Sequence, residues 1–329
     1  MALVPNERID RIALGSCAHQ DYSQPIWEAV SEAAPNLFLM IGDNVYADTT
    51  DFGEMQRAYE ALGSVPGFAK LRSRVPVLAT WDDHDYGAND AGAEFEAKQL
   101  AKRALVEFFG VPEDAPMRQR PGVYQSYVLG PPGQRVQILL LDGRWFRSAL
   151  ERDPSPYFRY RPRLDSEATM LGEAQWAWLE EQLQQPAEVR LIVSGIRVLS
   201  YASGFESWKN LPLEQERLFS LLRKTRAGGV ILLSGDAHFS ELSRGDGGLG
   251  YPLYELTSSS LNRANPRGAA RPAPLAVFPP YGDHNFGWIE LQWEGEPSIT
   301  LSTRNEMGGT VFAQEIPLRK LQPPTEIID

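Results

Sequence analysis

The chain of 329 residues contains only one cysteine and four histidines. A single cysteine, Cys17, excludes a disulfide bond within the chain. No apolar run approaches the roughly 18 residues that a membrane-spanning helix requires. Lys and Arg are also in the minority, at 32 against 43 Asp and Glu, and the resulting net charge of −11 disfavours binding to a nucleic-acid backbone. These deficits indicate an acidic globular protein with a small-molecule ligand.

The start of the chain, Met-Ala-Leu-Val-Pro, lacks the charged and apolar segments of a signal peptide, so we expect no leader in this sequence. This observation leaves the location of the protein open. The content of 43% hydrophobic and 10% aromatic residues is sufficient for a large core. The oligomeric state is also left open.

Apolar runs alternate with amphipathic segments over the first two thirds of the chain. The runs predict strands at residues 12–16, 37–41, 75–80, 136–141, 190–194 and 230–234. Apolar residues at three- and four-residue spacing predict helices at residues 24–33, 93–109, 172–184 and 213–226. This alternation is typical of βαβ units around a largely buried sheet.

After about residue 239 the pattern changes to alternating apolar and polar residues. It predicts antiparallel strands at residues 253–257, 286–293, 298–304 and 310–316, interrupted by a Pro- and Arg-rich loop at 262–280. Residues 110–121 form a second excursion. Because no repeat or linker divides the chain, we expect one domain over residues 1–329. Its alternating β/α part covers about 8–240, and its β-rich part at about 241–320 closes the second sheet.

Four of the predicted strands end in residues that can bind metal ions. These residues are Cys17, then Asp43, Asn44 and Tyr46, then Asp82, Asp83, His84 and Asp85, and finally Asp236 and His238. In α/β sheets, ligands bind beyond the carboxyl ends of the strands, so these four strand ends can meet. A Gly-Asp-Asn turn can instead cap a helix, and a cysteine can simply fill the core. The Asp-Asp-His-Asp segment favours a cation, because its carboxylates otherwise repel one another.

The ordered set of motifs resembles the calcineurin-like metallophosphatases and, more specifically, the PhoD-like alkaline phosphatase D family. The similar segments are Gly-Ser-Cys17, Gly-Asp43-Asn44-x-Tyr46-Ala-Asp48, Trp81-Asp-Asp-His-Asp85 with Asn89, Leu141-Asp-Gly-Arg144, Leu171-Gly-x-x-Gln175-Trp and Ser234-Gly-Asp236-x-His238. They extend from about residue 11 to at least residue 260. The resemblance implies a four-layer α/β/β/α sandwich of two mixed sheets, a metal-dependent phosphoric ester hydrolase and an exported protein.

The resemblance also implies a multinuclear metal centre, typically of iron and calcium. Its expected ligands are Cys17, Asp43, Tyr46, Asp83, Asp236 and His238, with Asp43 as the bridge between metals. Thiolate and phenolate donors favour Fe³⁺, whereas Asp83 and Asp236 offer hard oxygens to Ca²⁺, or alternatively to Mg, Mn or Zn. The sequence departs from the superfamily at residues 194–197, where the usual histidine is missing. This shortage of nitrogen ligands disfavours a zinc pair.

For the reaction, we expect attack on phosphorus by a metal-bound hydroxide. His84 is expected to support the leaving group, and Arg144 to contact the phosphate, with a surface salt bridge as the alternative role of Arg144. Further residues are expected to lie in the pocket or to support the ligands: His19, Asn44, Asp82, Asp85, Asn89, His284 and Asn285.

The expected substrate is a small phosphate ester, and three functions are compatible with the motifs. The first is a phosphomonoesterase. The second is a phosphodiesterase or phospholipase that acts mainly on diesters. The third is a non-catalytic metal-binding protein of the same fold, against which the retained pair of Asp83 and His84 argues.

Overall fold

Apolar strands occupy the centre of the molecule and form two six-stranded sheets. The computed structural model describes residues 4–155, 158–199 and 205–324. In the first sheet the strand order is β14 (Thr310–Pro317), β13 (Ser298–Asn305), β12 (Asn285–Gln292), β1 (Arg11–Gly15), β2 (Leu37–Ile41) and β3 (Val77–Thr80). In the second it is β10 (Ser240–Gly245), β11 (Leu253–Ser258), β9 (Val230–Ser234), β8 (Val189–Ser194), β5 (Val136–Leu140) and β4 (Gln125–Leu129).

Both sheets are mixed. Strands β1, β2 and β3 are parallel to one another, and β12, β13 and β14 continue that sheet in antiparallel fashion. Strands β5, β8, β9 and β11 are parallel, with β4 and β10 antiparallel at the two edges. The carboxyl ends of three strands in one sheet and four in the other are therefore available to build a site.

The alternation of side chains along each strand explains why both faces of the sheets are buried. In β2, Leu37, Leu39 and Ile41 belong to the core that continues into the second sheet. Phe38 and Met40 point to the opposite face, where they pack in a separate cluster with helical residues. A strand that is apolar on both faces must be covered on both, and a second sheet and a layer of helices provide that cover.

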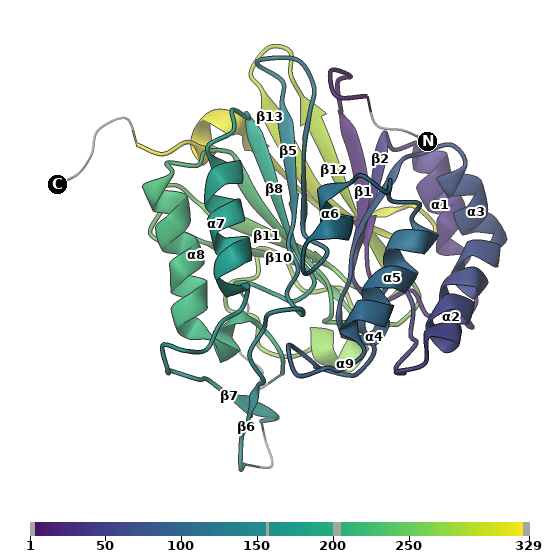
Figure 1. The fold of residues 1–329 in the computed structure, drawn as a ribbon. Helices are drawn as coiled ribbons and strands as arrows, with labels where there is room; N and C mark the ends of the chain where they lie inside the picture. The colour runs from purple at the N-terminus through teal and green to yellow at the C-terminus, as the bar shows by residue number, and fades with distance from the viewer. Residues whose placement is uncertain (1–3, 156–157, 200–204, 325–329) are drawn as a thin grey trace.

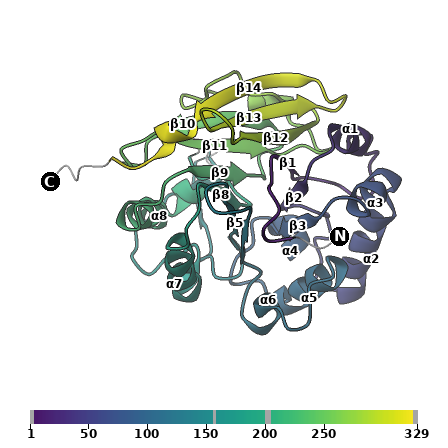
Figure 2. The ribbon, with the colours of Figure 1, turned by 90° about the horizontal axis from the view of Figure 1, so that it is seen from above.

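Helices cover the outer faces of both sheets (Figures 1 and 2). Beside the first sheet lie α1 (Ile26–Ala33), α2 (Phe52–Ser64), α3 (Pro66–Arg72) and α5 (Lys98–Phe108), and beside the second lie α7 (Gly172–Leu183) and α8 (Pro212–Lys224). The predicted four-layer α/β/β/α sandwich is confirmed. Among the described residues, no helix has the length and apolar character needed to span a membrane.

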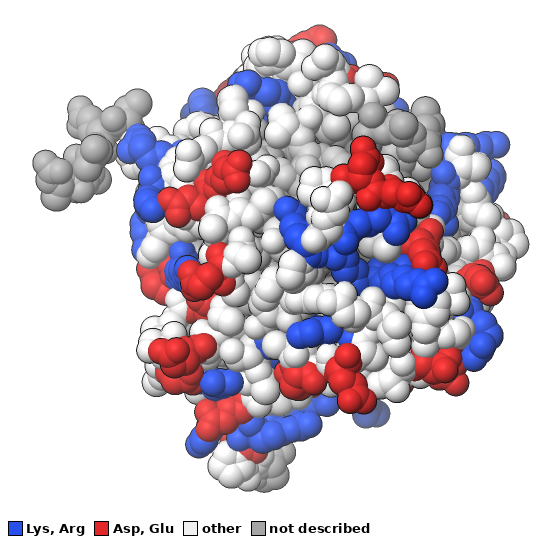
Figure 3. All heavy atoms as spheres, in the orientation of Figure 1, with Lys and Arg blue, Asp and Glu red and all other residues white. Residues whose placement is uncertain are grey.

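The remaining helices, turns and strands are short. They are the helices α4 (Asp83–Tyr86), α6 (Pro116–Gln119) and α9 (Pro266–Ala269), the 3₁₀ turns Trp208–Asn210 and Leu318–Leu321, and the ribbon β6 (Glu151–Arg152) with β7 (Tyr160–Arg161). Acidic and basic side chains are intermingled on the face shown in Figure 3, with basic ones gathered over α5 and α6. On this face the negative net charge is therefore not concentrated in one patch.

The predicted strands of the apolar runs are all present, but several elements were missed. Helices α2 and α3 fill the connection between β2 and β3, and strands β4 and β10 form the edges of the second sheet. In β4 the first four residues are only half-buried, so its sequence lacks a continuous apolar run. The helix expected at 93–109 begins at Lys98. Helices α6 and α9 lie within the two segments expected as loops.

The β-rich part does not only close the second sheet, as we expected, because its strands are divided between both sheets. Strands β10 and β11 join the second sheet, where β11 is parallel to β9, and β12, β13 and β14 join the first. Polar contacts also join the sheets near the carboxyl ends of their strands. Thr80 Oγ1 donates to Leu141 O at 2.7 Å, and Ser16 Oγ donates to Ser258 O at 3.3 Å. This arrangement supports our proposal that the chain forms one domain.

Candidate metal centre

Tight turns at the strand ends direct the polar side chains toward one region. Cys17 follows β1, Asp43 follows β2, Asp83 begins α4 after β3, and Asp236 and His238 follow β9. All but one of these residues have positive φ, which is uncommon without glycine. The non-glycine residues with positive φ are Cys17, Asp43, Asp48, Asp90, Asp236 and His238, together with Ala34 and Arg226 after two helices. Such backbone strain concentrates at functional sites.

A first group of donors surrounds the carboxylate of Asp43. Cys17 Sγ and Tyr46 Oη donate to Asp43 Oδ2 at 3.3 and 3.2 Å. Tyr46 Oη also lies 3.1 Å from His238 Nε2. The ligand atoms of Cys17, Asp43 and His238 all lie within 4.8 Å of one another. The structure thus brings four of the six predicted ligands together.

A second set of donors adjoins the first and contains the other two predicted ligands. Asp43, Asp83 and His84 have ligand atoms within 4.8 Å of one another, as do Asp82, Asp83 and Asp236. Asp43 belongs to the first group and also to this set, which is the position that a bridging carboxylate requires. We therefore retain the proposal that Asp43 bridges two metal ions.

The electrostatics of these groups fit metal cations. Burial raises the pKa values of Asp43 and Asp236 well above normal, and neighbouring acidic groups add to the effect. Burial likewise raises the pKa of the Cys17 thiol to about 11 and lowers that of His238 to about 4. The buried Oδ2 atom of Asp82 has no hydrogen-bond partner. Bound cations would stabilise the ionised carboxylates and use this vacant oxygen.

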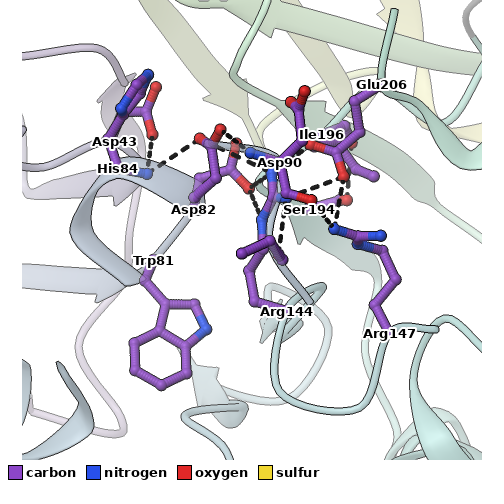
Figure 4. A network of polar contacts seen from close by, with 12 residues as sticks. Asp43, Trp81, Asp82, His84, Asp90, Arg144, Arg147, Ser194, Ile196 and Glu206 are labelled. Atoms are coloured by element: carbon purple, nitrogen blue, oxygen red, sulfur yellow. Dashed lines mark hydrogen bonds and ion pairs between the residues drawn. The ribbon is translucent and has the colours of Figure 1, made fainter. Parts of the chain in front are cut away.

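A buried network of charged side chains holds one side of the centre (Figure 4). Arg144 Nε donates to Asp82 Oδ1 at 2.7 Å, and its Nη2 atom lies 2.7 Å from Glu206 Oε2. Arg147 Nη2 lies 3.1 Å from Glu206 Oε1. Nη2 of Arg144 is also 3.9 Å from Asp83 Oδ1. Burial raises the pKa of Asp82, but the guanidinium of Arg144 opposes that shift.

Arg144 therefore has partners other than the phosphate that we expected. Its side chain is 0% exposed, and it is not among the residues that line the cavity described below. The alternative role that the sequence suggested, a surface salt bridge, is also wrong because the ion pairs of Arg144 are fully buried. Arg144 orients Asp82 and lies beside Asp83, and we propose it as a positioning residue.

His84 is held by a residue that our site prediction omitted. Its Nδ1 atom lies 2.8 Å from both carboxylate oxygens of Asp48, and its ring packs against that of Tyr46 at 4.2 Å. Burial opposes protonation of His84, but Asp48 and Asp83 raise its pKa above the normal value. Asp48 belongs to the Tyr46-Ala-Asp48 motif, and this motif could have indicated that Asp48 is part of the site. Glu206, also omitted, has no comparable motif.

The remaining predicted residues divide into those near the centre and those away from it. Asn44 and Asp85 are buried and bonded to each other, and Asp85 Oδ1 accepts from Asp82 N at 2.6 Å. His19 stacks on Tyr46 with ring centroids 4.9 Å apart. These three residues support the ligand turns, whereas Asn89 lines the main cavity.

The two residues expected from the β-rich end lie elsewhere. His284 lines a second, smaller cavity and its Nδ1 atom lies 2.8 Å from Glu306 Oε1. Asn285 is buried in β12, where its Oδ1 atom accepts from Ser258 Oγ at 3.0 Å. Neither residue lines the main cavity. The polar sequence around His284 and Asn285 therefore did not show that they belong to the candidate metal centre.

Gly195 lies in the connection after β8, where the usual histidine is missing, and it closely approaches Asp82. A Cβ atom added to Gly195 would lie 2.5 Å from Asp82 Oδ1. The carboxylate of Asp82 thus occupies the space that a larger side chain at position 195 would need. Arg197, in the same connection, pairs with Glu241 at 2.6 Å and lines the cavity.

The donor groups open onto a cavity of about 420 Å³. Asp83, His84, Asp236 and His238 contribute to its wall. Other parts of the wall come from residues 265–275 and from the segment around Phe239. A cavity of this size holds an organic ligand much larger than a phosphate ion.

A family model described as PhoD-like phosphatase matches residues 53–306. The chain belongs to the PhoD-like phosphatase family. The predicted family is therefore confirmed, and membership implies bound metal ions and a phosphate-ester substrate. No curated protein matches the sequence of this chain.

Solved structures show the same fold at low sequence identity. The structure of PhoD has a TM-score of 0.75 and 15% identity, over 99% of this chain and 73% of that chain. A purple acid phosphatase, PPD1 of yellow lupin (Lupinus luteus), has a TM-score of 0.67 and 13% identity, over 99% and 58% of the two chains. A dimetal phosphatase of Danio rerio has a TM-score of 0.60 and 14% identity, over 95% and 100%. The fold is thus that of the metallophosphatases.

The substitution Arg144→Ala is expected to lower the free energy of unfolding by about 3–5 kcal/mol, because it leaves the buried Asp82 without its ion-pair partner and leaves Glu206 with Arg147 alone. Urea denaturation measures this change. The control Lys224→Ala removes a surface ion pair with Glu180 and should cost about 1 kcal/mol or less. Unchanged stability of Arg144→Ala with a raised KM for the phosphate ester would instead assign Arg144 to substrate binding.

Stability without metal is expected to fall as the pH rises above about 6.5, the ordinary pKa of histidine. The raised pKa values of Asp43, Asp82 and Asp236 mean that the folded state holds protons that the unfolded state has lost. Raised pKa values of Asp85, to about 7, and of His84 act in the same direction. His238 has the opposite effect on stability, because its lowered pKa leaves it neutral in the folded state. This effect operates only below about pH 6.5, where histidine in the unfolded state binds a proton.

Thermal unfolding of chelator-treated protein between pH 6.5 and 8.5 measures this effect. The midpoint should decrease across the range, and added metal should raise it most at the alkaline end, where the carboxylates are already ionised. A midpoint that rises with pH in the metal-free protein would contradict the proposed charge imbalance.

Proposed function

We propose that the protein is a metal-dependent phosphoric ester hydrolase of the alkaline phosphatase D type. The observation that carries this proposal is the pair of adjoining donor groups at the wall of an organic-sized cavity, with His84 beside them. Family membership gives the reaction class, and metal ions held by the donor groups would neutralise the negative charge of a phosphate ester.

The ligand set suggests two kinds of metal ion. Cys17, Tyr46, Asp43 and His238 would hold Fe³⁺, because thiolate and phenolate are strong anionic donors for a trivalent ion. Asp43, Asp83 and Asp236 would hold Ca²⁺ through hard oxygens, with Mg, Mn or Zn as alternatives. When bound, such ions neutralise charge on the phosphate and lower the pKa of a coordinated water.

The proposed reaction consumes one water molecule. A bond forms between its oxygen and phosphorus, the bond from phosphorus to the ester oxygen breaks, and the departing oxygen receives a proton. His84 is the proton donor that the geometry favours, because it lines the cavity while Nδ1 is held by Asp48. Asp48 thereby leaves Nε2 as the nitrogen that serves the substrate.

Purified protein with its metals is expected to hydrolyse 4-nitrophenyl phosphate, and parallel assays with bis(4-nitrophenyl) phosphate determine the preference for monoesters or diesters. Chelation should abolish turnover of both, and metal addition should restore it. Elemental analysis with a visible spectrum tests the ligands, because Fe³⁺ bound to Tyr46 or Cys17 absorbs visible light through charge transfer. Metal-independent turnover, or no turnover at any metal loading, would refute the proposal.

The substitution His84→Ala is expected to lower kcat by about 10²–10⁴-fold through loss of a proton donor. Asp48→Asn should lower kcat by about 10–100-fold with little change in KM, because it releases the ring of His84. Asparagine also tolerates the positive φ of 45° at position 48, so the backbone turn is preserved. Steady-state kinetics with the metal-loaded variants measure both effects.

Glu306→Gln provides the matched control. It alters a second histidine–carboxylate pair of equal length, 2.8 Å, outside the main cavity. Its kinetic constants should stay within about twofold of the unsubstituted protein, as for most surface changes. Equal losses in the Asp48 and Glu306 variants would show that general destabilisation, rather than the orientation of His84, causes the effect.

A further inference from the structure

The wall of the main cavity has two kinds of lining. One kind is acidic and includes Asp83, Asp90 and Asp236. The other comes from the Pro- and Arg-rich segment 262–280, from Phe239 and from Phe205. Metal cations would balance the acidic part, so the rest of the wall determines which organic group the substrate carries.

The second part of the wall offers apolar surface to that group. Pro272, Pro274, Leu275 and Pro280 line it together with Phe239, which is 8% exposed. The guanidinium carbon of Arg197 lies 5.2 Å from the centre of the Phe239 ring, and Arg197 is neutralised by Glu241. The prolines and the aromatic ring favour contact with a flat apolar group, because these side chains offer no hydrogen bond to the hydroxyl groups of a sugar or polyol.

Two further arginines at the cavity wall have charges that the described protein does not neutralise. Arg267 and Arg271 line the cavity and are exposed. Among residues 4–155, 158–199 and 205–324, no carboxylate forms an ion pair with either of them. The other two arginines of the wall differ in this respect, since Arg159 pairs with Asp90 at 3.0 Å and Arg197 with Glu241.

The position of Arg271 links the positive charge to the apolar wall. Its guanidinium carbon lies 4.5 Å from the ring centre of Phe205, which is 45% exposed. Arg267 belongs to α9, four residues earlier in the same segment. The guanidinium groups can pair with a carboxylate or phosphate in a planar, bidentate geometry. In a chain of net charge −11, two arginines at one cavity with no carboxylate partner in the described part of the chain indicate a site for an anionic group.

We infer that this cavity binds phosphate esters whose leaving group combines a flat apolar body with a second anionic group. The phosphate lies at the metal ligands, the flat body lies against Phe239 and the proline-rich wall, and Arg267 and Arg271 pair with the second anion. This inference rests on the proposed hydrolase function and narrows its substrate class.

Two matched substrates test the inference: 4-carboxyphenyl phosphate and 4-(methoxycarbonyl)phenyl phosphate, which differ in the second negative charge. The leaving groups also differ in intrinsic reactivity, so the measured quantity is the ratio of their kcat/KM values, compared between variants. Arg267→Gln and Arg271→Gln should each lower the carboxylate-to-ester ratio by about three- to tenfold. Turnover of the ester should fall less than that of the carboxylate in these variants, because the ester lacks the second negative charge.

The control is Arg244→Gln, which removes an exposed cation that lies over Tyr254 at 5.9 Å and is outside the cavity lining. It should leave the ratio unchanged. The effect of Arg267 and Arg271 should also weaken as ionic strength rises, since exposed charges are screened by salt. An unchanged ratio in both cavity variants, or an equal fall in the Arg244 variant, would overturn the inference while leaving the hydrolase function standing.

A binding experiment separates this inference from turnover. The phosphonates 4-carboxybenzylphosphonate and 4-(methoxycarbonyl)benzylphosphonate carry a C–P bond in place of the ester bond, so calorimetry with metal-loaded protein reports affinity alone. We expect the carboxylate phosphonate to bind more tightly than the ester phosphonate, and Arg271→Gln to remove this difference. That result supports the anion subsite even if neither phosphate ester is hydrolysed. In that case only the proposed hydrolase function would be wrong. Equal affinities of the two phosphonates would contradict the proposed anion subsite.

Discussion

Buried negative charge is the constraint on which the rest of this structure depends. The ends of four strands bring carboxylates, a thiol and a phenol into a region from which water is largely excluded. Carboxylates in such surroundings stay ionised only where positive charge is supplied. On one side the protein supplies it through Arg144 and Arg147, and on the other the ligand atoms remain available for cations. The buried carboxylates on one side therefore belong to a supporting network with arginines, and those on the other side form the metal-binding face.

The layers of the fold determine where this charge accumulates. Because β1, β2 and β3 run parallel, and β9 runs parallel to its neighbours, their following turns emerge at one edge of each sheet. Bonds such as that from Thr80 to Leu141 hold the two edges together. The left-handed backbone of Asp43 and Asp236 then turns the side chains inward immediately after each strand. The ligands are thus placed by short turns on a rigid frame rather than by long loops.

Much of the fold and of the site could be predicted from the sequence, because each signal was local. Strands β1, β2, β3 and β9 lie in apolar runs of the sequence, and the ligand candidates directly follow them. What the sequence did not reveal depends on contacts between distant segments. The partners of Arg144, residues 82 and 206, are far from it in the chain, and neither pairing has a sequence pattern. The support of His84 by Asp48 and the separation of His284 from the main cavity are likewise visible only in three dimensions.

The close approach of Gly195 to Asp82 has a consequence for how such centres can change over time or be redesigned. A histidine at position 195 would enter the space of the Asp82 carboxylate, while removal of that carboxylate alone would leave the buried Arg144 with Glu206 as its remaining close ion-pair partner. Each of these two substitutions, made alone, would destabilise the protein before the metal centre gains a nitrogen ligand. Conversion of this oxygen-rich centre to one with an added histidine would require coordinated replacement of residues 82, 144 and 195.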